Sequence, residues 1–338
     1  MSTLPRLKMP VLAAIPLLAV LAGNGCGPGA ACRAREASFA MRSFEPQGGD
    51  RWIGDAVCYG PHRDGQRPGG PAPSAAQISE DLRLMAPHWR LLRLYGSSEL
   101  AETILAAIRA DGLGLKVMLG VWIDPGDTAA NRRETDAAIR LAEAYSELVL
   151  AVCVGNETQV SWSPHPCPLP LLLDHVRRVR EGVGVPVTVA DDFSFWNEPR
   201  SRTLAAEIDF ITMHAHPLWN GRQLNEALPW LRRQTDAVRA LHPGRAVVLG
   251  ETGWATSACG QGEQARLIKG RPGEAEQKQF FAAVRAWARA EGMTVFFFEA
   301  FDENWKGGPH PDEVEKHWGL FRADRSPKAA LAPGTAAP

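Results

Sequence analysis

The sequence predicts a single (β/α)8 barrel, because eight apolar, strand-like runs alternate with helical patterns along the chain. The alternation occupies roughly 280 residues, which is the usual size of this fold. The runs are also nearly continuous in apolar residues, as expected of parallel strands covered on both faces. In chain order they span residues 53–59, 89–95, 115–122, 148–154, 185–190, 208–214, 246–249 and 293–298.

Helical patterns lie between these runs. Ser74 and Gln77 form a capping-box signature ahead of a helix whose apolar residues share one face. A second helix follows Ser98 and ends near Gly112, a typical C-terminal cap. A doubly wound open sheet is the alternative fold, but no glycine-rich loop follows the first strand, where a phosphate would bind. Further helices are expected over residues 128–146, 169–181, 200–206, 224–241 and 274–291.

The two ends of the chain differ in composition from the middle. Arg6 and Lys8 precede an apolar stretch over residues 10–22, which is typical of a secretory signal and too short to span a bilayer. We therefore expect a secreted or periplasmic protein, with a membrane contact only if Cys26 is lipid-modified. The expected organisation is a signal peptide over 1–25, a linker over 26–51, the barrel domain over 52–325 and a disordered tail over 326–338.

Charge and cysteine content limit the partners of the chain. The 338 residues carry 37 Lys and Arg against 38 Asp and Glu, so no basic patch for nucleic acid is expected. The six cysteines show no spacing typical of zinc, and we expect neither a metal nor an organic cofactor. Cys167 and Cys259 follow different strands in long loops and are candidates for a disulfide, whereas Cys58 and Cys153 fit buried apolar positions.

Two glutamates stand at the ends of apolar runs. Glu157 follows the fourth run and Glu251 ends the seventh. A glutamate is seldom fully buried without a partner, and the carboxyl ends of all barrel strands meet at one rim. Both carboxylates are therefore expected to face one cavity. A pair of carboxylates is the minimum requirement for cleaving a glycosidic bond.

Charged and aromatic residues follow the other strands at the same rim. Flat indole rings bury the apolar faces of sugars and keep a polar N–H available, so these residues favour a glycan ligand. Six tryptophans are expected in or beside rim loops: Trp122, Trp162, Trp196, Trp219, Trp254 and Trp305. The residues expected to bind substrate are Tyr59, Arg93, Tyr95, Trp122, Asn156, His216, Trp219, Trp254, Glu303, Lys306 and Glu315.

Five short segments, in order, resemble glycoside hydrolase family 17, the β-1,3-glucanase family of clan A. They are VCYG at 57–60, RLY at 93–95, VGNE at 154–157, GETGW at 250–254, and FDENWK at 301–306 together with EKHWGLF at 315–321. The resemblance covers about residues 53–325 and is to a secreted, bacterial-type member. Two departures from the family pattern are Ala255, where proline is usual, and Trp305.

The resemblance implies a retaining double displacement on a β-glucan, with Glu157 as acid/base and Glu251 as nucleophile. It further implies that Glu303, Lys306 and Glu315 line the catalytic centre, and that Tyr59 and Tyr95 lie near the cleaved sugar. We expect Lys306 to help keep Glu251 ionised, while the charge of Glu251 raises the pKa of Glu157.

Three other functions remain open at this point. A β-1,3-glucan transglycosylase would use the same residues, with a sugar hydroxyl in place of water. A glycan-binding barrel without catalysis would need neither glutamate. His214 and His216, with Asp191 and Asp192 nearby, could instead serve a metal-dependent hydrolase or polysaccharide deacetylase. Linkage preference and endo or exo action depend on loop shape, which the sequence leaves open.

Overall fold

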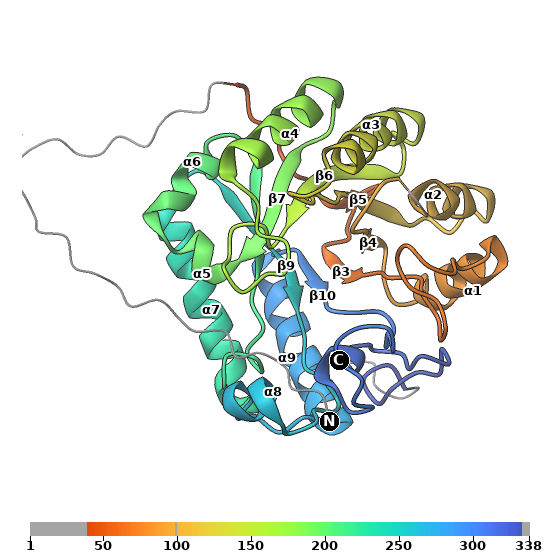
Figure 1. Ribbon diagram of the computed structural model, residues 1–338, viewed down its shortest axis with the longest axis vertical. Coiled ribbons are helices and arrows are strands. Elements are labelled where there is room, and N and C mark those ends of the chain that lie inside the picture. The colour runs from red at the N-terminus through yellow and green to blue at the C-terminus, as the bar shows by residue number, and fades with distance from the viewer. Residues whose placement is uncertain (1–38, 99, 333–338) are drawn as a thin grey trace, which may run out of the picture. The chain divides into compact units, whose positions relative to one another are not determined.

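Eight parallel strands close into one barrel, in the order β10-β3-β4-β5-β6-β7-β8-β9 (Figure 1). The computed structural model describes residues 39–98 and 100–332, so the predicted signal peptide and Cys26 lie outside the described residues. The closed ring confirms the predicted (β/α)8 barrel and excludes the open sheet. The strands are β3 Asp55–Cys58, β4 Leu91–Arg93, β5 Lys116–Val121, β6 Val149–Asn156, β7 Val187–Asp192, β8 Phe210–His214, β9 Ala246–Thr252 and β10 Val295–Phe297.

Helices surround the strands, as Figure 1 shows. The predicted capping box is present at the first, because the Ser74 side chain accepts from the Gln77 N–H and the Gln77 side chain accepts from Ser74. Among the described residues, no helix is long and apolar enough to cross a membrane. The helices are α1 Ala75–Met85, α2 Ala101–Ala110, α3 Thr128–Ala144, α4 Leu169–Gly182, α5 Phe193–Trp196, α6 Arg202–Ala205, α7 Leu224–Leu241, α8 Gly262–Leu267 and α9 Glu274–Glu291, with 3-10 turns η1 Pro199–Ser201 and η2 Val314–Lys316.

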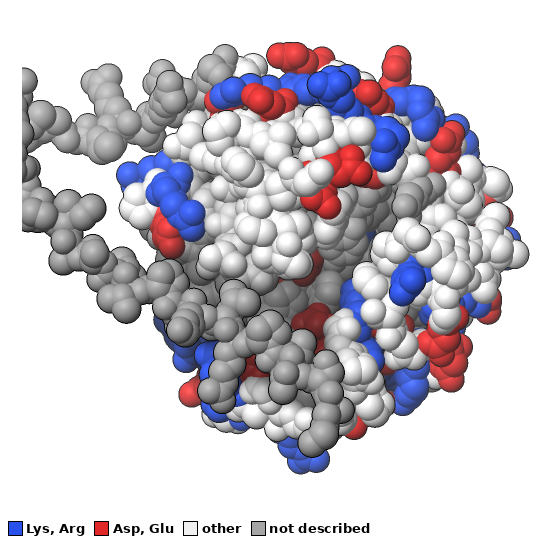
Figure 2. Space-filling view, viewed as in Figure 1, with Lys and Arg blue, Asp and Glu red and all other residues white. Residues whose placement is uncertain are grey.

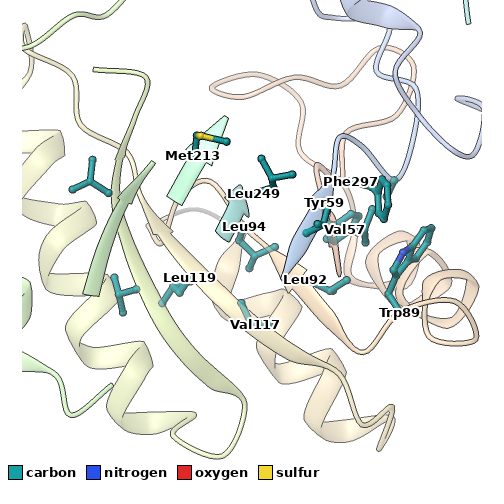
Figure 3. Close-up of a cluster of buried hydrophobic side chains, with 14 of the residues drawn as sticks. Val57, Tyr59, Trp89, Leu92, Leu94, Val117, Leu119, Met213, Leu249 and Phe297 are labelled. Atoms are coloured by element: carbon teal, nitrogen blue, oxygen red, sulfur yellow. The ribbon is translucent and has the colours of Figure 1, made fainter. Parts of the chain in front are cut away.

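Alternation along the strands divides the apolar side chains between two layers. Val57 and Leu92 belong to the layer between strands and helices, part of which Figure 3 shows. Their neighbours Cys58 and Leu91 belong to the cluster that fills the barrel. Because every second residue points inward, Arg93 follows Leu91 into the barrel, one level nearer to the carboxyl ends of the strands.

The end of the barrel at which the strands begin, here called the closed end, is covered by residues that we expected to form a linker. A short hairpin, β1 Gln47–Gly48 with β2 Arg51–Trp52, precedes the first barrel strand. The Phe44 ring stacks on Phe210 with centroids 4.4 Å apart. The Arg42 guanidinium donates to the carbonyls of Val185 and Arg180, each over 2.9 Å. The described part of residues 26–51 is thus attached to the barrel, through contacts between residues far apart in sequence.

The predicted disordered tail also differs from the structure. Lys328 is buried and its ammonium group donates to Asp302 over 2.8 Å. Leu331 is buried in the main core cluster. Residues 326–332 are therefore packed against the barrel, and only residues 333–338 of the predicted tail lie outside the described residues.

Candidate active site

The two glutamates meet at the carboxyl ends of the strands. Glu157 follows β6, and Glu251 lies near the end of β9. One oxygen of each carboxylate, together with a ring nitrogen of His214, lies within a group whose atoms are all within 4.8 Å of one another. This proximity fits a retaining glycosidase, whose carboxyls lie about 5–5.5 Å apart, better than an inverting one.

The backbone at Glu157 is in an unusual conformation. The φ of Glu157 is 51°, in the left-handed region. Gly155, two residues earlier, also has a positive φ, of 79°. A non-glycine residue in this region is strained, and such residues cluster at functional sites. The Glu157 N–H nevertheless donates to the carbonyl of Ala190 over 2.9 Å, which fixes the turn. The end of β6 is therefore shaped to direct one carboxylate across the barrel mouth.

Glu251 is surrounded by hydrogen-bond donors. Arg93 and the Tyr95 hydroxyl donate to the same carboxylate oxygen, over 2.5 and 2.9 Å. The His216 ring lies 3.4 Å from the other oxygen. Burial alone would raise the pKa of Glu251, but the charge of Arg93 and the hydrogen bond from His216 outweigh it and hold the pKa well below its ordinary value. Glu251 is thus prepared to act as an anion.

The surroundings of Glu157 favour the protonated form, the opposite of what Glu251 requires. Burial and then the charge of Glu251 raise the pKa of Glu157 well above its ordinary value. Its carboxylate lies 2.9 Å from Nδ1 of His214. Burial lowers the pKa of His214 to about 3, so this ring is a neutral hydrogen-bond partner and not a cation. Two neighbouring glutamates with opposite shifts define an acid and a nucleophile.

Lys306 does not neutralise Glu251, contrary to our expectation. Its ammonium group contacts Glu299 over 2.6 Å and Glu303 over 2.8 Å. Trp305 donates its indole N–H to Glu303 over 3.0 Å. Gly60 leaves room for this group, because a Cβ there would lie 2.5 Å from the Glu303 carboxylate. Lys306 therefore balances the charge of the acidic residues after β10. Arg93, and not Lys306, is the cation that keeps Glu251 ionised.

A cavity of about 750 Å³ lies over the pair. Figure 2 shows the corresponding hollow, with acidic side chains inside it. The Trp219 indole donates to Glu315 over 2.9 Å at its edge. Eleven of the expected site residues line the cavity: Tyr59, Tyr95, Trp122, Asn156, Glu157, His216, Trp219, Glu251, Glu303, Lys306 and Glu315.

Two expected substrate-binding residues do not line this cavity. Arg93 is 1% exposed and lies below the pair, where it also donates to Asn156 over 2.6 Å. Trp254 is equally buried, packs against Phe280 and donates its indole N–H to the carbonyl of Arg271. Trp196, another expected rim residue, is buried as well. The two tryptophans turn into the core, a direction that loop packing decides, whereas strand alternation directs Arg93 into the barrel.

Sequence reasoning did not select several residues that line the cavity. His165 is one of them, and its ring packs against Trp122 at an angle of 42°, with centroids 4.4 Å apart. Its position in the loop after the strand that carries Glu157 was an available signal. The other unselected charged or aromatic lining residues include His62, Glu134, Phe298 and Trp318.

The two aspartates suggested for a metal site make other contacts. Asp191 accepts from the backbone N–H groups of Gln159 and Asp192, over 2.8 and 2.9 Å. Asp192 caps α5. Within the described residues, one set of side chains is spaced for a metal ion, and it is Glu157, His214 and Glu251, the carboxylate pair and its bridging ring. Among the described residues, a metal-dependent hydrolase would therefore have no ligand set apart from the carboxylate pair itself.

The disulfide considered from the sequence is not formed. Cys167 and Cys259 are both free, as are the buried Cys58 and Cys153. Cys167 has its thiol directed to the carbonyl of Pro168 at 3.8 Å. Its loop is held instead by hydrogen bonds, such as that from the Cys167 N–H to the carbonyl of Thr158 over 2.9 Å.

A TIM barrel with two neighbouring glutamates at its mouth, whose pKa values are shifted in opposite directions, is the arrangement of a retaining glycoside hydrolase. A family model agrees: residues 56–319 match the BtgE/BtgC glycoside hydrolase domain, and the chain belongs to this family.

Curated relatives and a solved structure are similar over most of the chain. A glucan 1,3-β-glucosidase of Arthroderma benhamiae is 29% identical over 78% of this chain and 86% of its own length. The glucan endo-1,3-β-glucosidase btgC of Emericella nidulans is 26% identical over 77% of this chain, which spans 42% of that longer protein. The crystal structure of an endo-laminarinase from Formosa Hel1_33_131 has a TM-score of 0.73 and 25% identity, covering 82% of this chain and 86% of that one.

Proposed function

We propose that the chain is a retaining hydrolase of β-1,3-glucan, of glycoside hydrolase family 17, with Glu251 as nucleophile and Glu157 as acid/base. The observation that carries the proposal is the pair of neighbouring carboxylates with opposite pKa shifts. Relatives named for glucan 1,3-β-glucosidase activity support the choice of linkage. The cavity and its exposed indoles suit a carbohydrate chain.

In the first step the Glu251 carboxylate attacks the anomeric carbon. The bond from this carbon to the glycosidic oxygen breaks, and the departing oxygen takes the proton of Glu157. The product is a glycosyl ester on Glu251 and a released sugar with a new hydroxyl group. Arg93 and Tyr95 hold the attacking carboxylate in place, because both donate to one of its oxygens. The other oxygen, which lies 3.4 Å from the His216 ring, is the one that attacks.

In the second step the ester is resolved by water. Ester formation has removed the charge of Glu251, which was one of the causes that raised the pKa of Glu157. Glu157 is now an anion and takes a proton from water, while the water oxygen attacks the anomeric carbon and the ester bond breaks. Glu251 leaves as a carboxylate. Two inversions at one carbon give net retention of configuration.

Incubation of the purified chain with laminari-oligosaccharides tests this proposal. We expect shorter oligosaccharides as products. Proton NMR should show that they are released first as the β anomer. Longer products would show that a sugar hydroxyl resolves the ester and that the chain is a transglycosylase. Binding without any turnover would contradict an enzyme and leave the glycan-binding barrel.

We also propose that the chain is exported, since a β-glucan polymer is too large to enter a cell. The support is the signal-like composition of the first 25 residues, which lie outside the described residues. Mass spectrometry of the protein recovered from the producing cells should find a processed N-terminus near residue 25. Recovery of the intact N-terminus from the cytoplasm would contradict export.

A further inference from the structure

Most of the large apolar side chains left exposed lie in the cavity over the carboxylate pair. Among the described residues these exposed side chains are Met41, Trp122, Trp162 and Trp305, and the three tryptophans line the cavity. Their exposed fractions are 36%, 59% and 39%. Indoles exposed together in a cleft indicate a binding surface, because packing alone does not leave them in water.

The three indoles flank the carboxylate pair from opposite sides. Trp122 follows β5 and Trp162 follows β6, whereas Trp305 follows β10. In the closed strand order, β5 lies across the barrel from β9, and β6 lies across from β10. The cavity therefore has one aromatic end over β5 and β6 and another over β10.

The loop after β6 connects the first of these ends to the acid/base. The His165 ring packs against Trp122 in a tilted contact, and its Nε2 lies 2.7 Å from the carbonyl oxygen of Asn156, the residue before Glu157. The loop is fixed further by the Gln159 N–H, which donates to the buried Asp191. Trp122, His165 and the acid/base thus form one connected unit.

We propose that Trp122, Trp162 and His165 form the platform that binds the leaving-group side of a β-glucan chain. The reason is that Glu157 must deliver its proton to the departing oxygen, so the departing sugar lies on the same side as this residue. The glucosyl unit that becomes attached to Glu251 then extends towards Trp305. This assignment rests on the proposed function and gives each end of the cavity its own part of the substrate.

Glu134, a residue of α3, positions this platform from behind. Its buried carboxylate accepts from the backbone N–H groups of Ser97, Ser98 and Trp122, over 2.7, 2.9 and 3.2 Å. The Ser98 hydroxyl donates to it as well. One carboxylate thereby joins the loop after β4 to the loop after β5. Glu134 is a positioning residue, because it acts on substrate through the backbone of Trp122.

Two substrates that differ only in the leaving group test the platform. Laminaritetraose departs as a sugar, whereas β-laminaribiosyl fluoride loses a fluoride ion that no aromatic ring can bind. Trp122→Ala and His165→Ala should lower kcat/KM for laminaritetraose by about tenfold or more, as truncation of an aromatic anchor commonly does. The same variants should change kcat/KM for the fluoride by less than about twofold. Trp305→Ala, the matched variant at the other end, should lower both values together.

Glu134→Gln should give the same selective loss, because an amide nitrogen cannot accept from the backbone donors that now share the two oxygens. The readout is the ratio of the two kcat/KM values, which a partly unfolded sample does not change. An equal loss on both substrates, or no loss on laminaritetraose, would overturn the platform. If the wild-type protein cleaves neither substrate, the proposed function fails and the platform fails with it; if the wild-type protein cleaves both, only the platform is at issue.

Discussion

Two buried arginine–carboxylate pairs lie at opposite ends of the barrel. At the closed end, Arg180 donates to Asp209 over 2.6 Å, and at the open end Arg93 donates to Glu251 over 2.5 Å. No side chain of the four is more than 7% exposed. By length and burial the two pairs are almost the same, although only one of them lies in a catalytic site.

The pairs differ in what else the carboxylate contacts. Asp209 also accepts from the backbone N–H groups of Val187 and Arg42, over 2.7 and 2.8 Å, so the chain uses both oxygens. Glu251 lines the cavity and has Glu157 as a second carboxylate close by. A buried ion pair therefore does not identify a catalytic group. A catalytic carboxylate is identified instead by two features: it lines a cavity, and a second acid beside it favours the opposite protonation state.

The largest effect is expected at Glu251. Glu251→Ala removes the atom that attacks the sugar, so kcat should fall on the order of 10⁴-fold or more, while the far-ultraviolet circular dichroism stays unchanged. Glu263→Ala is the control, since this residue is 68% exposed on α8 and should leave activity unchanged. Activity retained in Glu251→Ala would show that the nucleophile is misassigned.

Glu157→Ala should lower kcat for laminari-oligosaccharides by about 10²- to 10⁴-fold, the usual contribution of a general acid. Added azide distinguishes the two glutamates. In Glu157→Ala, azide can attack the glycosyl ester on Glu251 and give a β-glycosyl azide. In Glu251→Ala it can attack the sugar directly and give the α product. Exchange of these two products between the variants would reverse the assigned roles.

Much of the fold, and the pair itself, could be predicted because the relevant signals are local. Apolar runs with glutamates at their ends occupy a few consecutive residues, and barrel geometry brings the ends together. The direction of a side chain at the rim, by contrast, has no local signal in the sequence. Trp122 and Trp254 both follow such runs, yet the first lines the cavity and the second donates to Arg271 inside the core.

The partners of charged residues were harder to predict for the same reason. Lys306 could be assigned to the rim, but its contact with Glu299 depends on how the segment after β10 folds back. Arg42 and Phe44 attach the supposed linker through residues more than 130 positions away. Single long-range contacts of this kind leave no periodic pattern in the sequence. They could therefore be found only in the structure.

Asp209→Asn should lower the free energy of unfolding by about 3–5 kcal/mol, because it leaves Arg180 buried without its charge partner. The activity of the folded fraction should remain unchanged, in contrast with Glu251. Asp236→Asn is the matched control, since this residue is exposed in α7 and should cost less than about 1 kcal/mol. Denaturant unfolding and active-site titration measure the two quantities. A loss of kcat per active site in Asp209→Asn would connect the closed end to catalysis.

The smallest expected effect is on the pH profile. Activity requires Glu251 ionised and Glu157 protonated, so kcat/KM should fall as the pH drops through the lowered pKa of Glu251 and as it rises through the raised pKa of Glu157. Arg93→Lys keeps the positive charge but loses the fork that donates to both Glu251 and Asn156. The acid limb should therefore move up by about one pH unit, which corresponds to about 1.4 kcal/mol, while the alkaline limb stays in place. An unmoved acid limb would show that Tyr95 and His216, without Arg93, suffice to keep the nucleophile ionised.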